Sequence, residues 1–184
     1  MKRGILVMCM FFVAVAVSGQ VKWDVRAGAN VSSFSKGEFD VRMGVKAGVG
    51  IEYAFSDLFA VRPGVFYSRK GAAEAGHKFT LNHKYIENLS YVELPVLAAF
   101  RFKMTEKFKL AINAGPYFAW LVGKKVVVDT RSVRIFDMGM EAGLDFLISS
   151  FVVGVGAQYG LTGLTGGDKA PHNINYSLTV GYRF

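Results

Sequence analysis

The clearest pattern in the sequence is the alternation of apolar and polar residues over positions 173–184. The apolar positions are Ile174, Tyr176, Leu178, Val180, Tyr182 and Phe184, and polar residues or glycine lie between them. A period of two is typical of a β-strand with one apolar face. Because this face carries two tyrosines and a phenylalanine, we interpret it as a lipid-facing surface. A strand in lipid must belong to a closed sheet, since a bilayer offers no water to an open edge.

Seven earlier segments show the same alternation, which predicts eight strands in total. They are 23–31, 44–53, 59–68, 91–102, 108–120, 136–146 and 151–160. The connections between them alternate between long and short, as in bacterial barrels with short periplasmic turns and longer outer loops. The expected fold is therefore all-β, an eight-stranded antiparallel up-and-down transmembrane β-barrel with both chain ends in the periplasm.

Aromatic residues near the ends of the apolar faces decide between a membrane barrel and a soluble barrel. A soluble eight-stranded barrel would turn its apolar faces inward. The aromatics expected at one end are Trp23, Phe59, Phe102, Phe108, Phe151 and Phe184, and those at the other are Tyr67, Trp120, Phe136 and Tyr159. Two such girdles match the two interfaces of a membrane, so we favour the membrane barrel.

The first residues indicate the compartment. Lys2 and Arg3 precede an apolar run that is too short to span a bilayer, and small residues follow it. We predict a cleaved signal peptide over 1–19 and one outer-membrane barrel domain over 20–184. The one cysteine, Cys9, lies in the predicted signal peptide, so disulfides and thiolate metal sites are not expected in the mature chain.

The inward faces predict a packed lumen with balanced charge. The acids expected there are Asp24, Glu52, Glu93, Asp137, Glu141 and Asp145, and the bases are Arg26, Lys46, Arg62, Arg101, Lys109 and Arg183. An eight-stranded barrel is just wide enough for its side chains to fill, and unpaired buried charges are costly. We therefore expect a paired network in the lumen, with a narrow pore as the alternative.

Three prolines conflict with regular strands. Pro63, Pro95 and Pro116 fall inside predicted strands, where each removes a donor from the hydrogen-bond ladder. We expect bulges or local register breaks at these positions.

Several short motifs together resemble the PorT-like outer-membrane β-barrel family of Bacteroidota. They are Tyr67-Ser-Arg-Lys-Gly71, Tyr91-Val-Glu-Leu-Pro95, Gly115-Pro-Tyr117, the acidic and glycine-rich segment 137–145, Tyr159-Gly-Leu-Thr162 and the final Gly181-Tyr-Arg-Phe184. The resemblance implies an outer-membrane location and a link to type IX secretion, which the namesake of the family serves. It implies no functional residues. Thr179 stands where the usual carboxy-terminal assembly signal has glycine.

The predicted outer loops 69–90 and 123–134 are basic, in a chain of formal charge +8. Such loops could pair with phosphates of lipopolysaccharide or simply be solvated. The segment 126–136 also reads as a hairpin that projects beyond the membrane, and its open edges could add a partner's strand. The expected partners are thus outer-membrane lipid, lipopolysaccharide and a protein bound through these loops. No nucleic acid is expected, and the barrel is expected to be monomeric.

A small lipid-modifying enzyme is the rival class. Its candidate groups would be His77, His83 and His172, with Ser68, Ser90 or Ser177, but a triad requires mutual hydrogen-bond reach that sequence spacing does not establish. His77 and His83 alone make a poor metal site. We therefore predict a non-enzymatic structural or binding protein of the envelope, with no catalytic, cofactor-binding or metal residues. A narrow pore and an adhesin stay open.

Overall fold

The computed structural model describes residues 21–35, 39–40, 42–70, 73–74, 85–127, 134–163 and 172–184. The predicted signal peptide, with Cys9, lies outside the described residues, as do His77 and His83. Among the described residues, no helix is long and apolar enough to cross a membrane.

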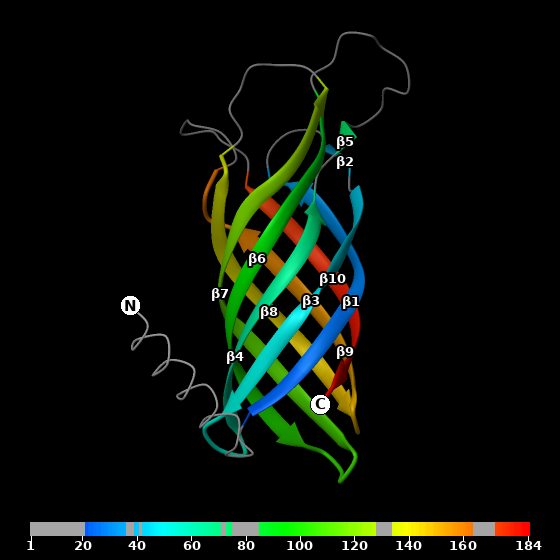
Figure 1. Ribbon diagram of the computed structural model, residues 1–184, viewed down its shortest axis with the longest axis vertical. Coiled ribbons are helices and arrows are strands. Elements are labelled where there is room, and N and C mark those ends of the chain that lie inside the picture. The colour runs from blue at the N-terminus through cyan, green and yellow to red at the C-terminus, as the bar shows by residue number, and fades with distance from the viewer. Residues whose placement is uncertain are drawn as a thin grey trace, which may run out of the picture.

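Eight long strands close into one antiparallel barrel (Figure 1). They are β1 (Val21–Phe34), β3 (Arg42–Ala54), β4 (Phe59–Lys70), β6 (Tyr85–Lys103), β7 (Phe108–Val127), β8 (Phe136–Ile148), β9 (Phe151–Gly160) and β10 (Asn173–Arg183). Each strand pairs with the next one along the chain, and β10 pairs with β1 to close the wall. Two short strands, β2 (Phe39–Asp40) and β5 (Ala73–Glu74), pair with each other at the outer end. The predicted up-and-down barrel is confirmed.

The alternation in the sequence sorts side chains between lipid and lumen as predicted. On β10, Tyr176 and Leu178 are 61% and 54% exposed, whereas Asn175 on the same strand is 1% exposed. Polar side chains therefore fill the interior and apolar ones cover the outside, the reverse of a soluble protein. Aromatic pairs mark both ends of the wall, with Trp120 against Phe136 at one end and Tyr182 against Phe184 at the other.

Short turns join the strands at the periplasmic end. The N–H of Phe59 donates to Ser56 Oγ at 3.0 Å, and the N–H of Phe108 donates to Thr105 Oγ1 at 3.1 Å. The two-residue connection from β8 to β9 consists of Ser149 and Ser150, and Ser149 has a φ of 55°. A left-handed residue is common in two-residue hairpin turns because it matches the twist of the strands.

The strands at the outer end run further than predicted, and one prediction about the loops is wrong. β4 continues through Lys70 and β6 begins at Tyr85, so part of the predicted loop 69–90 is strand. The predicted hairpin over 126–136 lies mostly outside the described residues; Val126 and Val127 of β7 pair with Ile86 and Tyr85 of β6 on the other edge. Residues 128–133 lie outside the described residues.

The three strand prolines break the ladders locally, as predicted, but they form no bulge and do not shift the register. Pairing of β3 with β4 stops at Gly50–Gly64 and resumes at Tyr53–Val61 in the same register. The ladders beside the other two prolines likewise lapse and resume without a shift. The register shifts of the β6–β7 ladder lie elsewhere, between Ile86 and Asn88 and between Ser90 and Tyr91.

Candidate functional site

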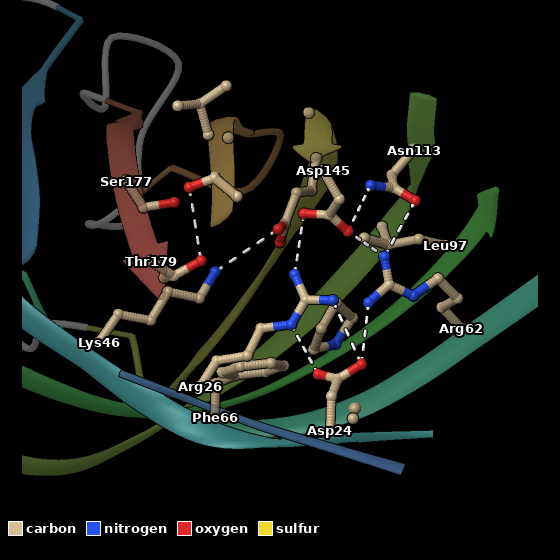
Figure 2. Close-up of a pocket in the computed structure, with 18 of the residues that line it drawn as sticks. Asp24, Arg26, Lys46, Arg62, Phe66, Leu97, Asn113, Asp145, Ser177 and Thr179 are labelled. Carbon is tan, nitrogen blue, oxygen red and sulfur yellow. Dashed lines mark hydrogen bonds and ion pairs between the residues drawn. The ribbon is translucent and has the colours of Figure 1, made fainter. Parts of the chain in front are cut away.

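The centre of the lumen holds a closed cluster of two arginines and two aspartates (Figure 2). Arg26 donates to Asp24 at 2.6 Å and to Asp145 at 2.8 Å. Arg62 donates to both of the same carboxylates, at 3.0 Å to Asp24, and Asn113 donates to Asp145 at 2.9 Å. All five side chains are at most 8% exposed. Bidentate arginine bonds of this kind satisfy buried carboxylates well.

Glu52 forms ion pairs with three arginines toward the periplasmic end of the lumen. Arg101 lies 2.8 Å and Arg183 lies 2.5 Å from its carboxylate oxygens, and Arg62 Nε lies at 3.4 Å. Glu52 itself is 1% exposed. Because Arg62 also contacts Asp24 and Asp145, it joins this cluster to the central one.

A second group of charges lies toward the outer end. Lys46 Nζ is 3.4 Å from Glu93 and 3.5 Å from Glu141, and Gln158 donates to both carboxylates at 3.1 Å and 2.6 Å. Lys70 Nζ is 2.5 Å from Glu93. Glu93 is thus a buried carboxylate held by two lysines and an amide, which offsets the cost of removing it from water.

Aromatic side chains close the lumen above this group. Leu89, Tyr91, Tyr117 and Ala119 form a buried cluster, and the Lys70 ammonium lies 4.9 Å from the centre of the Tyr117 ring. Cation–π contacts stabilise an ammonium in such a position. The outer end of the described lumen is therefore closed by side chains.

One cavity of about 60 Å³ separates the central cluster from Lys46. Its lining includes Asp24, Arg26, Lys46, Gly50, Arg62, Pro63, Gly64, Phe66, Pro95, Leu97, Asn113, Glu141, Gly143, Asp145, Gly154, Ser177 and Thr179. A polar cavity of this size can hold a few water molecules. Glycines create the space: a Cβ on Gly154 would lie only 2.6 Å from Asp145 Oδ1.

The predicted lumen charges are found on the inner face with two corrections. Lys109 is only half-buried and makes none of the ion pairs among the described residues. Lys70, which the sequence placed in an outer loop, is 1% exposed and paired with Glu93. Continuing the period of two along β4 from Arg62 to Lys70 would have placed it correctly, because the strand is longer than its sequence pattern indicated.

The described histidine and serine candidates of a triad lie in separate environments. The backbone N–H of His172 donates to Ser35 Oγ at 3.0 Å, and its ring stacks on Tyr159. Ser68 accepts from Asn30 inside the lumen, and Ser177 lines the cavity. Ser90 accepts from the Tyr67 hydroxyl on the outer surface. Within the described part of the chain, no three His, Cys, Asp or Glu side chains are arranged to hold a metal ion.

Comparison with known families gives one match. The family model described as "Outer membrane protein beta-barrel domain" matches residues 15–166, which is most of the chain. No curated protein matches the chain.

Solved structures of small outer-membrane barrels are similar to this fold. Ail, the attachment invasion locus protein of Yersinia pestis, matches with a TM-score of 0.54 and 17% identity, over 90% of this chain and 99% of Ail. The outer membrane protein OprG of Pseudomonas aeruginosa matches with a TM-score of 0.53 and 13% identity, over 89% and 95%. The outer membrane enzyme PagL matches with a TM-score of 0.53 and 16% identity, over 86% and 98%. At these identities the likeness concerns the fold alone.

Proposed function

This chain belongs to the outer membrane protein beta-barrel domain family, and on that premise we propose that it is a non-enzymatic binding protein of the outer membrane. In this proposal the barrel anchors a strand extension that captures a partner outside the cell, and the lumen conducts no ions along its axis. The outer-membrane location predicted from the sequence is confirmed by the family.

The observation that carries the proposal is a two-stranded extension of the barrel wall, formed by 85–88 of β6 and 124–127 of β7. These segments pair with each other. Pairing of β6 with β4 ends at Leu89, and pairing of β7 with β8 ends at Trp120. Among the described residues, no strand therefore pairs with either outer edge of the extension. Figure 1 shows it rising above the rest of the wall.

An extension whose edges are unpaired among the described residues suits strand addition by a partner. Unpaired N–H and C=O groups along an edge form a template for another chain, and many peptide-binding domains use this mode. The extension stands beyond the aromatic girdle at Trp120 and Phe136, so the edges face water rather than lipid. We therefore assign partner binding to this element.

The contents of the lumen support a role without conduction or chemistry. Its carboxylates are held by arginines and lysines, and the Tyr91 and Tyr117 cluster closes the outer end. The described candidates His172 and Ser90 engage Ser35, Tyr159 and Tyr67 rather than one another. This arrangement favours a binding role over a lipid-modifying enzyme.

The finer form of the proposal concerns the partner. The motifs that resemble the PorT-like family of Bacteroidota support an accessory role in type IX secretion, with a protein of that machinery as the partner. Arg69 and Arg134 are exposed at the outer end and support additional contacts with the phosphates of lipopolysaccharide. The barrel is proposed to act as a monomer.

Affinity capture from native membranes tests this function. The tagged protein should retain one recurring protein partner in stoichiometric amount, identified by mass spectrometry. In a matched variant, short glycine-serine links replace 73–88 and 124–133. The amount of partner captured should fall by at least about tenfold, because the main-chain hydrogen bonds of the strand interface are removed.

The matched control replaces the periplasmic turn 104–107 with a glycine-serine turn of equal length, which should leave capture unchanged. Both variants should keep the heat-modifiable gel mobility of a folded barrel. Retained capture by the shortened variant would contradict the proposed interface, and recovery of lipopolysaccharide alone would contradict the protein partner.

A further inference from the structure

Three prolines that are far apart in the sequence lie side by side in the barrel wall. Following the register across neighbouring strands, Ile51 of β3 faces Pro63 of β4, Pro63 pairs with Val96 of β6, and Val96 faces Pro116 of β7. These four residues form one lipid-facing row. The next row, which faces the lumen, contains Gly50, Gly64 and Pro95. We call the two rows together the proline seam.

The hydrogen-bond ladder is interrupted at each of these prolines, always on the same side. Pro63 lacks a partner in β3, Pro95 lacks one in β4 and Pro116 lacks one in β6, while each keeps its partner in the following strand. Because proline has no N–H, the carbonyls of Ile51, Gly64 and Val96 lose their ladder donors. Three consecutive strand interfaces are thus weakened along one row of paired residues.

The lumen cavity lies directly behind the proline seam. Gly50, Pro63, Gly64 and Pro95 all belong to its lining. Since the inward row here carries glycines, the wall between cavity and bilayer is little more than the backbone. The ladder interruptions and the cavity are independent observations, and they coincide at the same residues.

A bilayer penalises the carbonyls that have lost their donors. Strand edges are not left open to the hydrocarbon region, because no water is present there to satisfy them. In this barrel the polar groups of the cavity lining lie on the inner side of the seam. Without the cavity, an interruption across three strand interfaces would be hard to sustain.

We propose that the proline seam is a lateral port, through which small uncharged molecules pass between the bilayer and the lumen cavity. The charge of the lining selects the class of ligand. Its three cations, Arg26, Lys46 and Arg62, balance its three carboxylates, Asp24, Glu141 and Asp145. No excess charge attracts an ion, whereas the lining offers both apolar contacts and polar partners to a neutral molecule (Figure 2).

The apolar contacts come from Phe66, Pro95 and Leu97, and the polar groups include the hydroxyls of Ser177 and Thr179. A neutral molecule with one polar group could therefore enter from lipid and exchange its polar contacts with those of the cavity. This port lies within the wall and does not depend on the partner proposed for the outer extension.

Cysteine labelling in lipid vesicles tests the port. In the mature chain, verified by mass spectrometry to lack Cys9, Leu97→Cys places a thiol at the cavity. Uncharged N-ethylmaleimide should label this thiol faster than a sulfonated maleimide of the same reactivity. Replacing all three prolines (Pro63→Ala, Pro95→Ala and Pro116→Ala) should restore three ladder donors. The rate at which N-ethylmaleimide labels Leu97→Cys should then fall by about tenfold or more.

The control is Lys107→Cys, which places a thiol in an exposed periplasmic turn, because maleimides react with the thiolate and a thiol in hydrocarbon stays protonated. Its labelling by N-ethylmaleimide should not change when the prolines are replaced. If the triple variant fails to form a heat-modifiable barrel, the single variant Pro95→Ala should give a smaller slowing in the same direction.

Two results would overturn the port. One is equal labelling of Leu97→Cys by both reagents with no effect of the prolines, which would place access at an end of the barrel. The other is no labelling of Leu97→Cys by either reagent while Lys107→Cys reacts, which would mean that the wall stays closed.

Discussion

At the scale of single residues, the interior of this barrel depends on carboxylates that each serve more than one cation. Asp145 accepts hydrogen bonds from Arg26, Arg62 and Asn113. Asp24 contacts the same two arginines, and Glu52 contacts three. Removing one such carboxylate would leave two guanidinium groups with fewer partners in a lumen that largely excludes water. Removing one partner of an exposed ion pair in a turn leaves the other partner in contact with water.

Asp145→Ala should lower the free energy of unfolding by about 3–5 kcal/mol, the range found when one partner of a buried ion pair is removed. Urea-induced unfolding in lipid vesicles, followed by the fluorescence of Trp23 and Trp120, measures this change. The control is Glu106→Ala, which removes the exposed pair with Lys103 and should cost less than about 1 kcal/mol. Equal effects of the two substitutions would contradict a paired lumen.

At the scale of elements, the connections set which strand ends can extend. The periplasmic turns are short and held by hydrogen bonds from Ser56 and Thr105, so the strands there end at similar levels. At the outer end β6 and β7 run past their other neighbours and form the extension. The tightest connection, from β8 to β9, contains Ser149 with a φ of 55°.

Ser149→Gly should raise the free energy of unfolding by about 1 kcal/mol, because glycine adopts the left-handed region without the cost that a Cβ imposes. The same unfolding measurement applies. Ser150→Gly is the matched control, since Ser150 is not among the described non-glycine residues with positive φ. It should leave the stability unchanged or lower it slightly. A loss of stability in Ser149→Gly would argue against this turn geometry.

At the scale of the whole molecule, the lumen charges form a nearly continuous path without an open channel. The clusters around Glu52, Asp145 and Glu93 follow one another from the periplasmic end to the outer end. Two tyrosines and Leu89 cover the last of them. Such a network is suited to stabilising a narrow barrel, because most of the described lumen charges are paired inside a wall that offers few other partners.

The purified protein should therefore show no steady ion conductance in planar bilayers. A wide porin inserted under the same conditions serves as the positive control for the measurement. Stepwise, voltage-independent openings of the reconstituted protein would contradict the closed lumen, and would make the narrow pore the better interpretation. The lateral port is compatible with the expected result, since it is proposed for uncharged molecules.

The sequence by itself determined the fold, the membrane location and the two faces of the wall. In a barrel each strand pairs with its neighbours along the chain, so a period of two and the alternation of turn lengths are sufficient to find the eight wall strands, although not their outer ends. Five of the six predicted acids, Asp24, Glu52, Glu93, Glu141 and Asp145, are in buried or half-buried ion pairs. Asp137 is buried and hydrogen-bonded to Asn173.

Only the tertiary structure decided which residues of different strands meet in the closed barrel. Arg62 and Asp145 are 83 positions apart and meet across the lumen, and no local pattern specifies that pair. Lys70 entered the lumen because β4 is longer than its apolar alternation. The prolines lie in neighbouring rows of the wall because strand register, not sequence spacing, decides which residues face each other. Their juxtaposition follows from the registers of three consecutive ladders, which no local pattern specifies.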